Sequence, residues 1–252
     1  MRVALCFWGL CRSTHLIITS LERQVFGMLQ NADIEYDVYV HTYSITRPYT
    51  NPRSGEYELQ LRNSSWKYLK PNSVLIEDQD ERDKKIGLIK YRSKGNPWAD
   101  EESQQELPWH SLDNHLRAIW SLKQVTGLWQ ASKESYDWIV YLRPDVRYLT
   151  PFDIVWFDIL GSKDIGCPDF QQIAGCNDRF AVCRPEVAKV YGNRFDNALE
   201  YSRQKPLHSE TFLAETMTMA RVSFVPLAIR FVRIRTDGQI CPTDIEKLTN
   251  CT

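Results

Sequence analysis

The stretch that decides the fold is Asp137-Trp138-Ile139-Val140-Tyr141-Leu142-Arg143-Pro144-Asp145-Val146-Arg147-Tyr148. Its apolar run, residues 138–142, is short and rich in β-branched and aromatic side chains, so it predicts a fully buried strand. Charged side chains follow the run at once. Open α/β sheets place their ligand crevice at the carboxyl ends of such strands, so the sequence predicts a binding site here.

One carboxylate, Asp145, stands between the guanidiniums of Arg143 and Arg147. This arrangement suits a metal ion together with an anionic phosphate group, which points to a nucleotide-linked substrate. An Asp-x-Asp pair at a strand end would suit Mg²⁺ or Mn²⁺ better, and here an arginine replaces one of the two acids. Asp145 is therefore the one metal ligand that the motif offers, and the guanidiniums could carry the diphosphate charge instead. A plainer interpretation stays open, in which an Arg–Asp ion pair closes the strand at a turn.

The first half of the chain alternates strands and helices. Residues 2–8, 37–40 and 74–77 predict strands, and helical spacing of apolar residues predicts helices at 16–29 and 112–132, with Ser111 as the cap of the second. The alternation predicts an α/β fold with a mixed, mainly parallel sheet flanked by helices. We expect one domain over residues 1–252, with a nucleotide-binding half at 1–150 and an acceptor-facing half at 151–252.

The remaining segments are less regular. In the second half we expect short strands at residues 165–168, 178–183, 222–225 and 229–234, and helices at 184–201 and 208–219. Residues 47–72 read as a loop with one helix at 56–69. Residues 78–109 are charged and contain Gly and Pro, so we expect a mobile surface excursion that could be a lid over the donor site.

Composition excludes several classes of protein. The formal net charge of the 252 residues is −1, so nothing global attracts nucleic acid or an anionic membrane. No run reaches transmembrane length, and the opening apolar run is too short for a signal peptide. We therefore expect a soluble protein of the reducing cytoplasm, in which the N-x-S/T sequences at Asn63 and Asn250 are chance matches. The 7 cysteines contain no C-x-x-C pair, which leaves a zinc ribbon unsupported.

Two further strand ends carry polar candidates. Gly9 and Arg12 lie in the loop between the first strand and the first helix, and a helix N-terminus favours anions, so both are candidates for binding the diphosphate. Arg12 could equally be a solvated loop residue. His41 follows the second strand and could contact the base or the ribose of a nucleotide, or simply cap the strand.

The second half offers candidates for the sugar and for the acceptor. Asn177 and Asp178 could hold sugar hydroxyls, or could only make an Asx turn. His208 and Glu210 precede an apolar helix and are candidates for a general base. The alternative is that Ser209 or Thr211 caps the helix, with an acid in its first turn, which favours the helix dipole without catalysis.

Other catalytic templates are absent from the sequence. It contains no G-x-x-x-x-G-K-[ST] loop, no G-x-S-x-G elbow and no H-E-x-x-H pair. The dinucleotide fingerprint G-x-G-x-x-G is also missing, which argues against an oxidoreductase of that kind.

Several short pieces together resemble the GT-A-type glycosyltransferases found in large DNA viruses of algae and in bacterial surface-polysaccharide loci. The pieces, in the family's order, are Phe7-Trp8-Gly9-Leu10-Cys11-Arg12, Asp37-Val38-Tyr39-Val40-His41-Thr42, Tyr141-Leu142-Arg143-Pro144-Asp145-Val146, Asn177-Asp178-Arg179-Phe180-Ala181 and the late Val232-Arg233-Ile234-Arg235-Thr236-Asp237-Gly238. A narrower resemblance is to chlorovirus enzymes that build capsid glycans, with a xylosyltransferase as the particular likeness.

This resemblance implies a Rossmann-like half for a nucleotide sugar and a smaller half for the acceptor. It makes Asp145 the metal-binding acid, with Mn²⁺ or Mg²⁺ as cofactor. It places Asp178 near the transferred sugar and Glu210 where inverting members keep their base. The implied activity moves a sugar, with xylose as a candidate, from a nucleotide such as a UDP-sugar to a glycan hydroxyl, with a capsid-protein glycan as a candidate acceptor. The implied place is the cytoplasm, that of the host if the protein is viral.

Two other functions stay open on the sequence. A nucleotidyltransferase that makes the sugar nucleotide would use a similar sheet, although residues 9–12 are a poor version of its usual Gly-rich, basic loop. A non-catalytic glycan-binding protein could use the 12 Tyr and 8 Trp residues as stacking platforms.

Overall fold

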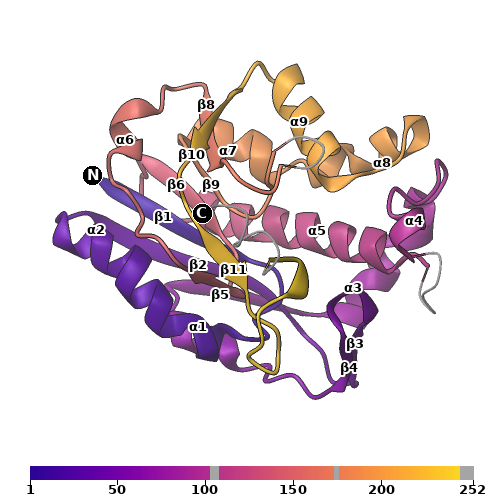
Figure 1. The fold of residues 1–252 in the computed structure, drawn as a ribbon. Helices are drawn as coiled ribbons and strands as arrows, with labels where there is room; N and C mark the ends of the chain where they lie inside the picture. The colour runs from indigo at the N-terminus through magenta and orange to yellow at the C-terminus, as the bar shows by residue number, and fades with distance from the viewer. Residues whose placement is uncertain (103–107, 173–175, 245–252) are drawn as a thin grey trace.

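The computed structural model describes residues 1–102, 108–172 and 176–244 and is built on one seven-stranded sheet (Figure 1). The strand order is β10-β8-β9-β6-β1-β2-β5, and every neighbouring pair is parallel except the two that β9 makes. The predicted α/β class with a mixed, mainly parallel sheet is confirmed. The strands are β1 (Arg2–Trp8), β2 (Glu35–Ser44), β5 (Ser73–Asp78), β6 (Trp138–Leu142), β8 (Asp164–Pro168), β9 (Ala181–Cys183) and β10 (Ser223–Leu227).

Helices cover both faces of the sheet, because the central strands are apolar on both sides. In β1, Val3, Leu5 and Phe7 point to one face, while Ala4, Cys6 and Trp8 belong to the core of the other. The first face packs against α1 (Thr14–Leu21), the π-helix η1 (Glu22–Phe26), α2 (Gly27–Asn31) and α6 (Trp156–Ile159). The second packs against α5 (His110–Gln130), α7 (Pro185–Gly192) and α9 (Ser209–Met219).

The predicted helices are largely confirmed, with two differences in detail. Trp109, not Ser111, is the N-cap residue of α5. The helix expected at 184–201 is divided into α7 and α8 (Phe195–Gln204), because the chain leaves helical geometry at Asn193, directly after Gly192.

The helix expected at residues 56–69 is wrong. Residues Glu56–Leu59 form the strand β4, which pairs with β3 (Tyr49–Asn51), and only Ser65–Leu69 are helical, as the 3₁₀ turn η3. The 3₁₀ turn η2 (Pro52–Ser54) joins the two strands and ends at Gly55, whose φ of 68° turns the chain back on itself. This β3–β4 hairpin carries several residues of the candidate site.

The segment 78–109 is anchored rather than a loose excursion. It forms α3 (Gln79–Ile86), the 3₁₀ turn η4 (Leu88–Tyr91) and α4 (Ala99–Glu102), while residues 103–107 lie outside the described part of the chain. Ile86, Tyr91 and Trp98 are buried in one cluster with residues of α5, α8 and α9. The burial of these three residues could not be predicted from the charged sequence, because apolar residues this far apart show no periodicity.

A small second sheet brings the late part of the chain to the strand end predicted as a site. The strand β7 (Val146–Tyr148) pairs antiparallel with β11 (Phe231–Arg233). Just beyond β11, the Ile234 amide donates to the carbonyl oxygen of Asp145 at 2.8 Å. None of the helices in the three described ranges is both long and apolar enough to cross a membrane.

One buried histidine on α5 gives the fold a dependence on pH. His115 is 6% exposed and its Nε2 atom has no hydrogen-bond partner among the described residues. Burial lowers the pKa of His115 from 6.5 to about 3. Below the ordinary pKa of histidine, the unfolded chain therefore takes up a proton that the folded chain does not. The free energy of unfolding consequently decreases as the pH is lowered.

We expect the replacement His115→Gln to make this fall shallower. The wild-type contribution of His115 amounts to about 1.4 kcal/mol per pH unit between roughly pH 6 and pH 3, and the glutamine variant loses this slope. Urea unfolding at successive pH values measures it, with pH 8 as the reference because both side chains are neutral there. Parallel curves for the two proteins would contradict the assignment.

Candidate functional site

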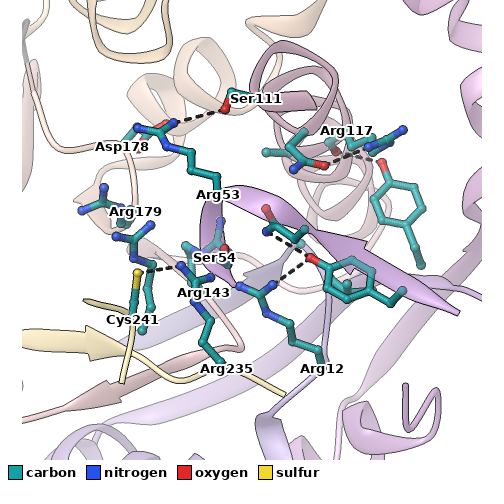
Figure 2. Close-up of a pocket in the computed structure, with 18 of the residues that line it drawn as sticks. Arg12, Arg53, Ser54, Ser111, Arg117, Arg143, Asp178, Arg179, Arg235 and Cys241 are labelled. Atoms are coloured by element: carbon teal, nitrogen blue, oxygen red, sulfur yellow. Dashed lines mark hydrogen bonds between the residues drawn. The ribbon is translucent and has the colours of Figure 1, made fainter. Parts of the chain in front are cut away.

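A cavity of about 470 Å³ lies at the carboxyl ends of β1, β2 and β6, where the sequence predicted a crevice (Figure 2). Its walls come from several parts of the chain. These are the loop after β1, Tyr43 near the end of β2, the β3–β4 hairpin, Gln79 at the start of α3, the first half of α5, the residues after β6 and before β9, and the segment around β11.

The lining is rich in arginine. It holds seven arginines and one carboxylate, that of Asp178. The arginines are Arg12, Arg53, Arg117, Arg143, Arg179, Arg233 and Arg235. Asn51, Ser54, Ser111 and Asn114 add neutral hydrogen-bonding groups, and Tyr43 and Tyr49 add aromatic ones. A cavity with this lining is suited to an anion.

Asp145 lies behind the lining and is fully buried. Arg143 donates to both of its carboxylate oxygens, at 2.8 Å each, and Arg12 donates to Oδ2 at 2.9 Å. Burial by itself would raise the pKa of Asp145, but the charges of Arg143 and Arg12 outweigh it and hold that pKa well below its usual range. The structure thus has the strand-closing Arg–Asp ion pair that the sequence left open, extended by a second arginine.

Three further carboxylates hold arginines of the lining from behind. Glu56, 2% exposed, accepts from Arg12 at 2.8 Å and from the Thr236 amide at 3.0 Å. The remaining pairs are Asp83 with Arg117 and Asp244 with Arg233, both bidentate. Such fork geometry fixes where each guanidinium points.

Two arginines are less well neutralised. Arg235 is 5% exposed; it donates to the sulfur of Cys241 at 2.6 Å, lies 3.9 Å from Glu56 and leaves its Nε without a partner. Burial and the charge of Arg12 lower the pKa of Arg235. Arg179 bonds to Gln171 and makes no carboxylate contact among the described residues. Burial and the charge of Arg233 lower its pKa to about 10.

The loop after β1 is held by side chains of neighbouring strands and helices. Gly9 has a φ of 99°, a conformation that side-chain-bearing residues rarely adopt, and its amide donates to Ser121 Oγ at 2.7 Å. Ser121 Oγ in turn lies 2.7 Å from His41 Nδ1. The buried His41 therefore supports the loop from behind.

The same loop is tied to the late segment of the chain. Ser13 Oγ donates to the carbonyl oxygen of Ile234 at 2.7 Å, and Thr14 Oγ1 donates to that of Pro144 at 2.9 Å. Neither hydroxyl caps the helix α1, because each bonds to a distant segment of the chain instead. These bonds set the relative positions of Arg12, Arg143 and Arg235.

The structure brings together half of the residues singled out in the sequence. Gly9, Arg12, Arg143 and Asp178 line the cavity, and Asp145 lies directly behind it. The other five, Arg147, His41, Asn177, His208 and Glu210, are not lining residues.

These five residues lie outside the cavity lining, in the following positions. Arg147 lies in β7, opposite Val232, and both ring nitrogens of His41 are engaged, by Ser121 and by Glu77 at 3.1 Å. Asn177 accepts from the Arg179 amide at 3.1 Å, which is the turn that the sequence left as an alternative. His208, rather than Ser209 or Thr211, is the N-cap residue of α9 and makes no side-chain capping bond, while Glu210 is buried in the first turn.

Five arginines of the lining were not recognised as site residues in the sequence: Arg53, Arg117, Arg179, Arg233 and Arg235. Arg233 and Arg235 had a usable signal, because residues two apart in an extended segment point to the same side. Arg53 and Arg117 had none. Each is flanked by residues typical of a loop or a helix surface, and only the folded chain brings them to the cavity.

The residues around Asp145 do not fit the divalent metal implied by the sequence resemblance. Both oxygens of its carboxylate are taken by guanidiniums, which would repel a cation. Within the described ranges, no three His, Cys, Asp or Glu side chains gather as they would in a metal site built from protein ligands alone. No step of the reaction proposed below therefore uses a metal ion at Asp145.

Comparison with known proteins gives similarity to solved structures only. No protein-family model matches the chain, and no curated protein does. The chain is similar to mouse xyloside xylosyltransferase 1 in its apo form, with 12% identity, a TM-score of 0.40, and coverage of 90% of this chain and 84% of that one. It is also similar to a glycosyltransferase involved in the glycosylation of the major capsid of PBCV-1, with 8% identity, a TM-score of 0.40, and coverage of 90% and 81%.

Both of these structures are of the enzyme class named by the sequence resemblance.

Proposed function

We propose that the protein is a glycosyltransferase that moves a sugar from a nucleoside-diphosphate sugar to a hydroxyl of a glycan. The observation that carries the proposal is the cavity with seven arginines and a single carboxylate at the carboxyl ends of parallel strands. A diphosphate supplies the negative charge that these arginines require, and Asp178 can receive hydrogen bonds from a sugar. A volume of about 470 Å³ is in the range of small-molecule sites.

The arginines support the departure of the diphosphate. When the bond between the sugar carbon and the diphosphate oxygen breaks, its electron pair stays on the diphosphate. Guanidiniums already fixed by carboxylates, such as Arg143 by Asp145, stabilise this developing charge without reorganising. The acceptor oxygen forms the new bond to the sugar carbon and loses its proton.

Asp178 is our candidate for contact with the transferred sugar. It is half-buried, and its backbone carbonyl accepts from the hydroxyl of the buried Tyr191 at 3.0 Å, which fixes the chain here. As the one carboxylate in the lining, it can orient sugar hydroxyls or take the acceptor's proton. The sequence resemblance supplies the specific candidates: xylose as the sugar, a UDP-sugar as the donor and a capsid-protein glycan as the acceptor.

The test begins with thermal stabilisation by a panel of nucleoside diphosphates and nucleotide sugars. A ligand that binds the folded state raises the melting temperature by mass action, so a shift selective for one base identifies the donor. Release of the nucleoside diphosphate from that donor, in the presence of glycan acceptors, then measures transfer. Pyrophosphate release from a nucleoside triphosphate and a sugar phosphate would instead indicate the nucleotidyltransferase. Sugar binding with no effect of any nucleotide would indicate the glycan-binding module.

We expect Asp178→Asn to reduce turnover by about 100-fold or more while the nucleoside diphosphate still binds. The matched control is Asp153→Asn, which changes an exposed acid outside the cavity lining. Wild-type turnover in the Asp178 variant would remove Asp178 from the reaction.

A further inference from the structure

We propose that the cavity holds the nucleoside diphosphate without a divalent metal ion. In this proposal Arg179 and Arg235 receive the diphosphate, and Asp145 is a positioning residue that holds Arg12 and Arg143 beside it. The inference rests on the proposed function and specifies which groups bind the leaving diphosphate.

The first support is the coordination of Asp145. A carboxylate that binds Mg²⁺ or Mn²⁺ must turn a lone pair toward the ion. Here three guanidinium N–H groups from two arginines occupy the carboxylate, and the whole residue is fully buried. A metal at Asp145 would have to displace Arg12 or Arg143 and leave that charge without its partner, which is unfavourable in a buried site.

The second support is the surplus of positive charge. Four of the seven lining arginines, Arg12, Arg117, Arg143 and Arg233, are held within 3.1 Å of carboxylate oxygens. Arg179 and Arg235 have no such contact among the described residues. A dication would add to this surplus, whereas a nucleoside diphosphate, with roughly two to three negative charges at neutral pH, would neutralise it.

The third support is the state of Arg235. It is 5% exposed, and its Nε has no hydrogen-bond partner in the part of the chain that the structure describes. It contacts the sulfur of Cys241, which is a weak acceptor, and lies 3.9 Å from the Glu56 carboxylate. Figure 2 shows it in the group with Arg143, Arg179 and Cys241. A buried guanidinium with unused donors is costly, and an anion bound in the cavity would use them.

The test is calorimetric titration of the purified protein after EDTA treatment. UDP, GDP, ADP and inorganic pyrophosphate are titrated in EDTA, and again with MgCl₂ or MnCl₂. We expect one nucleoside diphosphate to bind in EDTA with a Kd within about threefold of its value with metal. Binding that requires metal would overturn this inference and leave the proposed function standing. Absence of nucleotide binding in both buffers would overturn the proposed function itself, and this inference with it.

The residue assignment is tested by Arg235→Gln and Arg179→Gln in EDTA. Loss of one charge-assisted contact is expected to raise the Kd of the diphosphate by about 10- to 100-fold and to make its salt dependence shallower. Arg203→Gln on α8 is the matched control, since Arg203 is exposed and lies outside the cavity lining. Folding of each variant is checked by its melting temperature. Wild-type Kd and salt dependence in both variants, when folded, would overturn the assignment.

Discussion

Replacement of Asp145 by alanine is expected to lower the free energy of unfolding by about 3–5 kcal/mol. Its carboxylate is fully buried and neutralises the guanidiniums of Arg12 and Arg143. Without it, Arg12 keeps Glu56, but Arg143 loses the only carboxylate that it contacts among the described residues. Urea denaturation followed by circular dichroism measures the loss. A metal ligand that served only the reaction would be removed at little cost to stability, so the experiment separates the two roles of Asp145.

The control for this prediction is Asp158→Ala, which removes an exposed acid from α6 and is expected to change stability by less than about 0.5 kcal/mol. A second variant, Asp145→Ala with Arg143→Met, removes one of the stranded charges and should recover part of the loss. Wild-type stability of Asp145→Ala would contradict the ion-pair role.

Replacement of Gly192 by alanine is expected to destabilise the protein by about 1–3 kcal/mol. A Cβ at Gly192 on α7 would lie 2.0 Å from Oγ1 and 2.8 Å from Cβ of Thr126 on α5. Thr126 cannot easily move, because its hydroxyl donates to the Leu122 carbonyl and lies 2.8 Å from the Tyr141 hydroxyl. The chain therefore needs glycine here to bring α7 and α5 into contact.

Gly127→Ala is the matched control, since Gly127 lies on α5 next to Thr126 and a Cβ there would meet nothing within 4 Å. Alanine favours helix over glycine, so this variant is expected to gain up to about 1 kcal/mol. Chemical denaturation of the two variants side by side gives the comparison. Shifts of the same sign and size would show that helix propensity, not the contact between α5 and α7, governs Gly192.

The sheet could be predicted because its signals are local. Each central strand contains a short apolar run, so the burial of residues such as Val140 and Val40 can be predicted from their neighbours in the sequence. The β3–β4 hairpin could not be predicted in this way. Glu56 looks like a helix-forming acid in a polar stretch, yet it is buried because Arg12 and Thr236, far away in the chain, supply its partners. Contacts of that range leave no periodic pattern.

The candidate site likewise contains residues with a local sequence signal and residues whose role depends on long-range contacts. Arg12, Arg143 and Asp178 were found because each follows or precedes a recognisable strand. The role of Asp145 could not be decided from sequence, because a metal ligand and a buried ion pair require the same residue at the same strand end. Only the positions of the two guanidiniums distinguish them. His41 and Glu210 are polar residues near strand or helix ends that lie outside the cavity lining; His41 contacts Ser121, and Glu210 is buried in the first turn of α9.

The contact between the loop after β1 and the segment around β11 has a consequence for synthesis of the protein. Arg12 precedes Arg233 and Arg235 by more than two hundred residues, so it is made well before them. Since β11 lies outside the seven-stranded sheet, the sheet has all its strands before β11 is made. A growing chain therefore has no complete anion site until the segment around β11 has been made, so an anion bound across the cavity could stabilise only chains that extend past Arg235.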